Sequence, residues 1–554
     1  MTRCPGPSGE ALSFNPQIFH KQLDRVHEHI KRRADELVEA ETTSRPDLIE
    51  RALREAPADL PEQGLGLNAT TSHLLESIAP ALMPGQAGPR FFGLITGGVT
   101  PAAQLADMLV SSYDPCVQVH WPEATASVAL ENLTLRYLLS LLSLPPSVFT
   151  QNTITTGATA SNILGLCLGR DWTVARIKRL RHGEPNWSVP EDGFGGVEVD
   201  VFVADAHASV RKAAALAGIG RRNVIDLGDR AKEEAGYLGC FDLEKLEAKL
   251  RANEEEGRAS IVAVSFGEVN TGALASDTPA VRALCDTYHA HLHIDAAFGA
   301  FAILDPSFAH YGPHLALADS ITSDAHKWLN VPYDSGLFFS RKLSLEDTTE
   351  GATASLFDLT GPGGNAPAYL ASAGPTANGP EAPVYPLVEQ SKTLPSPLFM
   401  NIENSRRFRA LPIYASLLSL GKEGYASLVQ RNIAFARCAE TYLRAHPAFD
   451  VLTPARPALP DTEAEDPWQF RTLNIVLFAP SDQAPERYRS DPDSFLRALN
   501  ETRECFFTPT VWRGRKAVRM AVSNWMTGLG ANDAEGGGRE WEVVKGVFER
   551  VARG

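Results

Sequence analysis

The sequence predicts an α/β protein whose large domain contains a mainly parallel, doubly wound sheet. Two observations support this fold class. Between residues 150 and 340, short apolar segments with strand periodicity alternate with helical segments, and this alternation is typical of parallel sheets with helices on both faces. Charged side chains also follow directly after several predicted strands, which is where such sheets bind their ligands.

The chain before this region is predicted to be helical. Residues 15–56 are rich in charged side chains, and we expect them to form an N-terminal helical arm of the kind that often packs on a partner subunit. A linker rich in Pro and Gly follows at 57–67. We expect helices at 71–82 and 124–144, and we assign 1–85 to an N-terminal helical segment.

The predicted strands and helices of the sheet region follow one another along the chain. Residues 197–203 show period-2 alternation and 261–266 form an apolar run, so both are predicted strands. Asp242 and Asp277 are candidate N-caps of two helices, the second with Pro279 in its first turn. The other predicted elements are strands at 223–227 and 291–294 and a helix at 209–216.

The regular pattern stops at residues 343–398, which are rich in Gly, Pro, Ala and Thr. A loop of this length in a compact enzyme is usually functional or disordered. After the loop, the chain predicts two helices, a β-like run at 472–478 and a last strand at 517–522. We therefore expect a large domain at 86–398, including the loop, and a small α+β C-terminal domain at 399–554.

The composition excludes several classes of protein. The chain has 554 residues, 44% hydrophobic and 21% charged, and a formal net charge of −15. This acidic balance argues against a nucleic-acid partner, because binding a phosphate backbone requires a basic surface. No apolar run predicts a membrane span or a signal peptide. The seven cysteines are scattered and never spaced Cys-x-x-Cys, so we expect reduced thiols in a cytoplasmic protein without a metal site.

Two charged residues in the middle of the chain predict the chemistry. Lys327 lies in the run Asp-Ala-His-Lys-Trp, and Asp295 begins the run Asp-Ala-Ala-Phe-Gly 32 positions upstream. A lysine amine forms an imine with the aldehyde of pyridoxal 5′-phosphate, and a buried carboxylate keeps the pyridine nitrogen of this cofactor protonated. The sequence therefore predicts a pyridoxal phosphate enzyme in which Lys327 carries the cofactor and Asp295 faces its ring.

Further residues are expected to complete the cofactor site. Small residues at 155–162 precede a helix, so the backbone of Ala158 and Thr159 is expected to hold the phosphate at the helix N-terminus. His207 is a candidate to stack on the pyridine ring and relay a proton, although a histidine after a strand is more often structural. His326 is expected to contact the cofactor phosphate or a substrate carboxylate.

Taken together, these segments resemble the pyridoxal phosphate-dependent group II decarboxylases, which include the aromatic-L-amino-acid and glutamate decarboxylases. The matching segments are 89–93, 155–162, 207–212, 295–297, 323–328, 405–412 and 518–527. The resemblance implies fold type I and an obligate homodimer with active sites at the subunit interface. It also implies that His207 stacks on the ring, that Asp295 pairs with the pyridinium, and that Lys327 is the Schiff-base lysine. Ala297 and Ser323 are expected to contact the cofactor.

Several positions depart from the family pattern. Glu268 and Val269 stand where threonine is expected, and Asn270 is the candidate to supply the missing cofactor contact. Asp324 follows a strand where many members have asparagine. A second carboxylate near a phosphate is costly unless it binds a hydroxyl group such as that of Ser323.

The substrate side of the site is less defined by the resemblance. Arg90 stands where enzymes for aromatic substrates often carry a tyrosine, and it either binds a substrate carboxylate or makes a structural ion pair. We expect Arg90 and its neighbour Phe91 on the substrate side. Tyr369 in the 343–398 loop is expected to return a proton to the substrate carbon after carbon dioxide leaves, with Tyr385 as the alternative.

The sequence therefore predicts an L-amino-acid decarboxylase, with an aromatic substrate as the first expectation and an acidic one kept open by Arg90. Related aldehyde synthases tend to have phenylalanine at the loop position, so Tyr369 favours decarboxylation over the alternative, an oxygen-dependent aldehyde synthase. A catalytically silent scaffold protein is a remote alternative. The expected partners are a small amino-acid substrate and a second copy of the chain, with no nucleic acid and no membrane.

Overall fold

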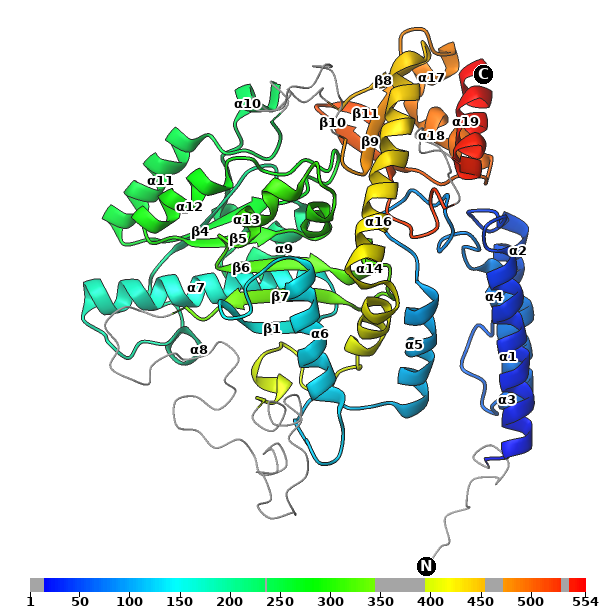
Figure 1. The fold of residues 1–554 in the computed structure, drawn as a ribbon, viewed down its shortest axis with the longest axis horizontal. Helices are drawn as coiled ribbons and strands as arrows, with labels where there is room; N and C mark the ends of the chain where they lie inside the picture. The colour runs from blue at the N-terminus through cyan, green and yellow to red at the C-terminus, as the bar shows by residue number, and fades with distance from the viewer. Residues whose placement is uncertain (1–13, 235–236, 344–393, 454–471, 530–537) are drawn as a thin grey trace, which may run out of the picture.

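The computed structural model describes residues 14–234, 237–343, 394–453, 472–529 and 538–554. Within these residues the chain forms one seven-stranded sheet and one four-stranded sheet. Figure 1 shows the larger sheet on one side of the long helix α16 (Ala410–Ala445) and the smaller sheet near the end of that helix. The N-terminal helices stand beside this body.

The larger sheet has the strand order β1-β7-β6-β5-β4-β2-β3. The strand bounds, in that order, are Phe149–Thr155, Gly336–Arg341, Ser320–Asp324, His291–Asp295, Ala259–Ser265, Val199–Val203 and Val224–Asp226. Strands β6, β5, β4, β2 and β3 are parallel, whereas β7 is antiparallel to both β6 and β1. The predicted mainly parallel sheet is therefore confirmed, and the four strands β2, β4, β5 and β6 end at one edge.

Helices cover both faces of this sheet (Figure 1). The odd-numbered apolar residues of β4 share a hydrophobic cluster with α7 (Ala158–His182) and α9 (Ala208–Leu216). The even-numbered residues share a second cluster with α11 (Leu243–Glu256) and α12 (Thr278–Thr287). Successive side chains of a strand point to opposite faces, so a continuous apolar run buries both faces of the strand.

Both predicted helix caps mark helix starts, but they act differently. The Asp242 side chain accepts a hydrogen bond from Lys245 N at the start of α11, as expected of an N-cap. Asp277 precedes α12, but its side chain makes no cap hydrogen bond there. Its carboxylate instead accepts from Phe241 N over 2.7 Å. Asp277 therefore fixes the segment before α11 rather than its own helix.

The smaller sheet is antiparallel, with the order β10-β11-β9-β8. Its strands are β8 (Phe449–Val451), β9 (Ile475–Pro480), β10 (Thr508–Trp512) and β11 (Arg515–Ala521). A third hydrophobic cluster packs this sheet against α18 (Pro492–Glu501), α19 (Gly538–Arg553) and the second half of α16; α17 spans Glu486–Ser490. The C-terminal region is thus α+β, as predicted.

Helix α16 joins the two cores. It changes direction at Gly421, whose φ of 60° lies in the left-handed region. Side chains before and just after this kink belong to the cluster of the large sheet, whereas those from Phe435 onward belong to the cluster of the small sheet. The domain boundary expected at residue 399 stays a prediction.

The N-terminal part is helical, as expected. Its helices are α1 (Pro16–Glu36), α2 (Pro46–Glu55), α3 (Gly66–His73), a π-helical turn at Leu74–Ile78, α4 (Ala79–Ala81), α5 (Pro101–Tyr113) and α6 (Ser127–Leu141). The predicted helix at 71–82 begins earlier, at Gly66, and α5 was not predicted. Among the residues that the structure describes, no helix has the length and apolar composition needed to cross a membrane.

Candidate active site

A cavity of about 470 Å³ opens at the edge where the parallel strands end. Residues that follow β2, β4, β5 and β6 line it, together with the turn between β1 and α7. The wall brings together seven of the residues expected at the site: Lys327, Asp295, His207, His326, Ala297, Ala158 and Thr159. These residues span 170 positions of the chain, so the parallel topology is what assembles them.

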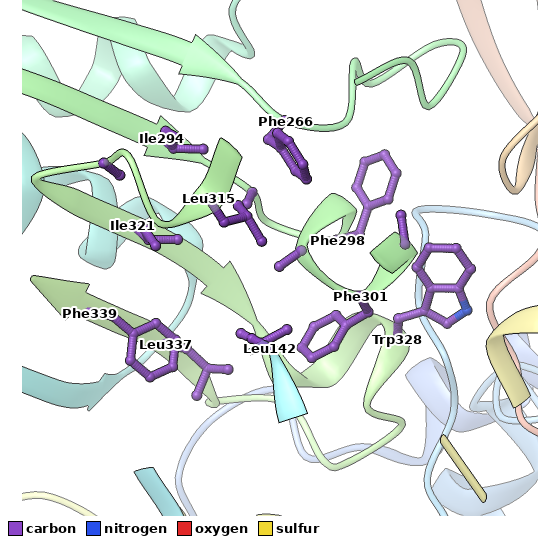
Figure 2. Packing of buried hydrophobic residues seen from close by; sticks show 14 of the residues in the cluster. Leu142, Phe266, Ile294, Phe298, Phe301, Leu315, Ile321, Trp328, Leu337 and Phe339 are labelled. Carbon is purple, nitrogen blue, oxygen red and sulfur yellow. The ribbon is translucent and has the colours of Figure 1, made fainter. Parts of the chain in front are cut away.

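Lys327 lies in α14 (Ala325–Trp328), a short helix directly after β6. Its side chain is 19% exposed, and Nζ lies 5.9 Å from the centre of the Phe298 ring. Trp328 is fully buried, and its Nε1 donates to Asn432 Oδ1 over 2.9 Å. Figure 2 shows Trp328 at the end of the core that underlies the sheet, near Phe301. Trp328 anchors the short helix, and Lys327 faces the cavity.

The end of this short helix is held by a segment almost 200 residues away. Asn330, with φ 55°, donates from Nδ2 to the carbonyls of Trp328 and Ser523. Its Oδ1 accepts from Trp525 N over 2.7 Å. Gly97 packs so closely on the Lys327 carbonyl that a Cβ there would overlap it. The 518–527 segment therefore acts on the site by holding the turn that bears the lysine.

Asp324, the last residue of β6, is the closest acidic partner of the lysine. Its Oδ2 lies 3.6 Å from Lys327 Nζ and 3.6 Å from His326 Nε2, and its Oδ1 accepts from Ala158 N over 2.7 Å. Burial raises the pKa of Asp324 to about 7, although Lys327 and the Ala158 N–H oppose the shift. The expected hydroxyl partner, Ser323, makes no hydrogen bond to it; Ser323 Oγ is buried with no partner among the described residues.

Asp295, the last residue of β5, is held by two donors. Asn162 Nδ2 donates to its Oδ2 over 2.8 Å, and Ala297 N donates to its Oδ1 over 3.2 Å. The carboxylate is 8% exposed and lines the cavity. The sequence pattern at 155–162 indicates a backbone site for a phosphate and gives no sign of the role of the Asn162 side chain.

His207 follows β2 and caps α9. Its Nδ1 accepts from Ser209 N over 3.1 Å and lies 2.8 Å from Ser209 Oγ. Desolvation lowers the pKa of His207; Asp295 opposes this effect, while Lys327 and Arg519 add to it. With Nδ1 accepting, the neutral ring keeps its proton on Nε2.

The turn before α7 can receive a phosphate group. The N–H groups of Ala160 and Ser161 donate to the Gly157 carbonyl, and that of Ala158 donates to Asp324. Of the two N–H groups expected to hold the phosphate, Ala158 N–H is therefore engaged, and Thr159 N–H has no partner among the described residues. A Cβ on Gly157 would meet only Asp324 Oδ1, at 3.9 Å, so the turn stays open. His326 also lines this cavity, and its Nδ1 is buried without a hydrogen-bond partner among the described residues. The residues present therefore fit a phosphate beside a lysine amine and a buried carboxylate.

Four expected residues lie off the cavity wall: the buried Ser323, together with Arg90, Phe91 and Asn270. Arg90 Nε donates to the backbone carbonyl of Glu504, which is a structural contact but not the ion pair expected as the alternative to substrate binding. Phe91 is 3% exposed and stacks on Phe506 at 4.8 Å. Asn270 Nδ2 donates to Glu268 Oε1, and its Oδ1 accepts from Thr510.

The Asn270 side chain hydrogen-bonds to the buried carboxylate of Glu268. The Glu268 carboxylate is 3% exposed and accepts from the backbone and side chains of Asn270 and Thr271. Burial raises its pKa, and these donors oppose the rise. Asn270 thus satisfies a buried acid. Tyr369 and Tyr385 lie outside the described residues.

Arg519 is a cavity residue that the sequence did not indicate. It comes from β11 of the small sheet, and its Nη1 donates to the Val269 carbonyl over 2.8 Å. The 518–527 segment was noted only as a motif. No local pattern connects it with the strand ends of the other sheet, so only the tertiary fold could place this arginine.

A mainly parallel sheet with a lysine and a buried carboxylate at its strand ends, beside a helix N-terminus, fits the class of pyridoxal phosphate enzymes. Residues 50–351 match the model of the pyridoxal-dependent decarboxylase conserved domain. This match covers more than half of the chain. The chain therefore belongs to the pyridoxal-dependent decarboxylase family; it is an amino-acid decarboxylase, and pyridoxal phosphate is its cofactor.

Similar proteins cover almost the whole chain. Tryptophan decarboxylase 1 of Oryza sativa subsp. japonica is 24% identical over 552 residues, 97% of this chain and 96% of that protein. A phenylacetaldehyde synthase of a Rosa hybrid cultivar is 23% identical over 93% and 92%. A crystal structure of Oryza sativa TDC with PLP and tryptamine has a TM-score of 0.73 at 21% identity, covering 98% of this chain and 100% of that one.

Proposed function

We propose that this decarboxylase acts on an L-amino acid with an aromatic side chain and releases the corresponding amine and carbon dioxide. The observation that carries the proposal is the cavity in which Lys327, Asp295 and His207 meet. The similarity to a tryptophan decarboxylase over nearly the whole chain supports the aromatic substrate. Arg90 donates to a backbone carbonyl and does not line the cavity, which supports an aromatic substrate over an acidic one.

Each cavity residue has a role that follows from its position. When bound, pyridoxal phosphate withdraws electrons from the substrate α-carbon, which makes loss of the carboxylate possible. Lys327 holds the cofactor, and Asp295 keeps a negative charge against its ring nitrogen. The N-terminus of α7 at Thr159 receives the phosphate. His207 covers the ring, and its Nε2 proton points away from Ser209.

Asp324 takes part in proton movement at the lysine. A protonated lysine amine is a poor nucleophile and must lose a proton before it can bind the cofactor. Asp324 Oδ2 lies 3.6 Å from Lys327 Nζ, and burial raises the pKa of Asp324 to about 7. The carboxylate can therefore hold the proton that the lysine releases, and neutral Asp324 no longer repels the phosphate.

The functional unit is proposed to be a homodimer in the cytoplasm. Apolar side chains stay exposed on the N-terminal helices, among them Phe19 on α1 and Leu53 on α2, the latter 74% exposed. Leu105 and Tyr113 on α5 are also exposed. A second copy of the chain would cover such a surface. No disulfide bond joins the six cysteines that the structure describes, which supports a reducing compartment.

The test is product analysis with purified holoenzyme. Incubation with each of the twenty common amino acids should release carbon dioxide and the matching amine, fastest with an aromatic one. Borohydride reduction followed by peptide mapping should label Lys327, and Lys327→Ala should abolish both the label and the activity. Labelling of a different lysine, or release of amine only from non-aromatic substrates, would contradict the proposal. Sedimentation of the same sample tests the dimer.

The second candidate function is an oxygen-dependent aldehyde synthase, which the similarity to a phenylacetaldehyde synthase keeps open. It would release ammonia and hydrogen peroxide in place of the amine, so both are measured in the same reactions. Under the decarboxylase proposal, Tyr369→Phe diverts product toward the aldehyde and Tyr385→Phe does not. The reverse result would assign the proton donor to Tyr385.

A further inference from the structure

Behind Asp295, side chains form a continuous hydrogen-bonded chain through the core. Asn162 Nδ2 donates to Asp295 Oδ2 over 2.8 Å, and Asn162 Oδ1 lies 2.9 Å from His293 Nε2. His293 Nδ1 lies 2.8 Å from Ser320 Oγ, which lies 2.9 Å from His291 Nε2. Asn162, His293, Ser320 and His291 are all 0% exposed. The chain runs from the cavity through the layer between α7 and the sheet.

The carboxylate sets the direction of every bond in this chain. An ionised carboxylate only accepts, so Asn162 must present its amide nitrogen to Asp295 and its oxygen to His293. His293 Nε2 therefore donates. Burial lowers the pKa of His293 to about 3, so the ring is neutral and Nδ1 accepts from the Ser320 hydroxyl. The Ser320 oxygen is then free to accept from His291 Nε2. Every donor in the chain points toward Asp295.

Helix α7 makes room for the two histidine rings with two glycines. A Cβ at Gly165 would overlap the His293 ring, and a Cβ at Gly169 would lie 2.6 Å from Cδ2 of His291. Glycine inside a helix costs about 1 kcal/mol relative to alanine. The glycines are one turn apart, and each faces one histidine. Helix α7 therefore carries two destabilising glycines that leave space for the buried His293 and His291 rings. Apolar residues packed at this interface would not require glycine in the helix.

The same amide is also linked to His207, a second residue of the cavity wall. Asn162 Nδ2 lies 3.1 Å from Ser209 Oγ, and Ser209 Oγ lies 2.8 Å from His207 Nδ1. One side chain therefore contacts the carboxylate expected at the ring nitrogen and, through one hydroxyl, the histidine expected over the ring. A residue that served only packing would not need both contacts.

We propose that Asn162 and His293 are positioning residues that fix the orientation of Asp295 and direct a polarised chain of donors at it, so that its charge meets the ring nitrogen of the cofactor. This inference rests on the role proposed above for Asp295. Hydrogen bonds in such a chain polarise one another, so loss of an inner member weakens the bond at the carboxylate. The effect should decline with distance from Asp295.

The experiment compares binding of two cofactors to the apoenzyme. One is pyridoxal phosphate, and the other is its 1-deaza analogue, in which a C–H group replaces the ring nitrogen. Wild-type protein should prefer pyridoxal phosphate, because only this cofactor meets the Asp295 charge. Asn162→Leu should reduce that preference about 10-fold, since it removes a hydrogen bond to a charged group. His293→Leu should reduce it about 3-fold, and Ser320→Ala less.

Two further variants distinguish an effect on the orientation of Asp295 from a general loss of stability. In His293→Gln the side-chain amide can still donate to Asn162 Oδ1, so the preference should recover toward the wild-type value. Thr134→Val removes a buried hydrogen bond in α6, where Thr134 Oγ1 donates to the Leu130 carbonyl, and should leave the preference unchanged. The absorbance of bound pyridoxal phosphate, followed against pH, gives a second readout of the proton on the ring.

The outcomes are distinguishable. If wild-type protein binds the two cofactors equally, Asp295 does not act on the ring nitrogen, and the role proposed for it fails together with this inference. If the wild type shows the preference and Asn162→Leu retains it, the chain is structural and only this inference fails. If Asn162→Leu and His293→Leu weaken the binding of both cofactors equally, the residues shape the cavity without acting through the ring nitrogen, and the inference is again overturned.

Discussion

Two buried aspartates face the same cavity from the ends of neighbouring strands, and their surroundings differ. Asp295 after β5 accepts from the Asn162 side chain and from Ala297 N, with further donors aligned behind Asn162. Asp324 after β6 accepts from one backbone N–H, that of Ala158, and otherwise lies beside Lys327 and His326. One carboxylate has its donors built into the core, and the other depends on the charge of the lysine next to it.

The difference separates a fixed charge from a variable one. The donors of Asp295 belong to α7 and to the backbone after β5, so they are part of the folded core rather than of a titrating neighbour. Burial raises the pKa of Asp324 to about 7, and Lys327 is the largest influence in the opposite direction. When the lysine loses its charge, that opposition is lost, so Asp324 takes up a proton more readily. An enzyme that must hold one proton and move another can use both arrangements.

The largest expected effect comes from removing the fixed charge. Asp295→Asn keeps the shape of the side chain but leaves the ring nitrogen without an anion, and we expect kcat to fall about 10³-fold, equivalent to about 4 kcal/mol. Asp324→Asn should cost less, about 10-fold, because its amide can still accept from Ala158 N. Steady-state kinetics of both variants check the order. Equal losses would mean that the two carboxylates do not differ in role.

A methyl group on α7 should disturb the Asp295 side more than the Asp324 side. Gly165→Ala drives a Cβ into the His293 ring, and overpacking of this kind costs about 1–3 kcal/mol of unfolding free energy even though alanine is the better helix former. Gly157→Ala is the matched control, because its Cβ would meet only Asp324 Oδ1 at 3.9 Å. Urea unfolding of both variants measures the contrast. A larger loss for Gly157→Ala would overturn it.

The smallest expected effect is a change in the pH dependence of stability. The pKa of Asp324 is about 7 in the folded protein and 3.8 for an ordinary aspartate, the value taken for the unfolded chain. Between pH 3.8 and pH 7, folding is therefore accompanied by uptake of a proton at Asp324. Its contribution to stability is complete below about pH 4 and is lost as the pH rises through 7. Asp324→Asn should therefore gain stability relative to wild type progressively across this range.

Unfolding curves at several pH values between 4 and 8 test this expectation. Asp171→Asn is the comparator, because burial raises the pKa of Asp171 to about 6. The stability of Asp171→Asn relative to wild type should stop increasing near pH 6, one pH unit below the point expected for Asp324→Asn. A constant difference between Asp324→Asn and wild type over the whole range would show that the carboxylate does not titrate there.

The elements that were predicted from the sequence are those whose pattern is local. The run at 261–266 and the helix after Asp242 were found because strand burial and helix capping leave their signal within a few residues. The strands β1, β7, β8 and β10 were not predicted. β8 has three residues and β10 is partly exposed, so neither carries a continuous apolar run. Tertiary contacts, rather than sequence pattern, fix such strands.

In the candidate site, too, residues with a local sequence signal were predicted, and residues placed by tertiary contacts were not. Lys327 and Asp295 were predicted from the short runs that contain them, and their positions at strand ends agreed, because a parallel sheet brings strand ends together. Arg519 was missed because it arrives from the other sheet, and Asn162 because its partners, Asp295 and His293, lie more than 130 positions away. Asn270 was assigned to the cofactor because a sequence cannot show that buried Glu268 engages the same side chain.

The hydrogen bonds between Asn330 and the 523–525 segment have a consequence for synthesis of the protein. Asn330 holds the end of the helix that carries Lys327, and its Oδ1 accepts from Trp525 N. During translation the lysine emerges about 200 residues before its brace exists. A nascent polypeptide can assemble the strands around the lysine early, but this turn acquires its final geometry only after residues 523–525 have been synthesised. Cofactor capture by ribosome-bound intermediates should accordingly begin late.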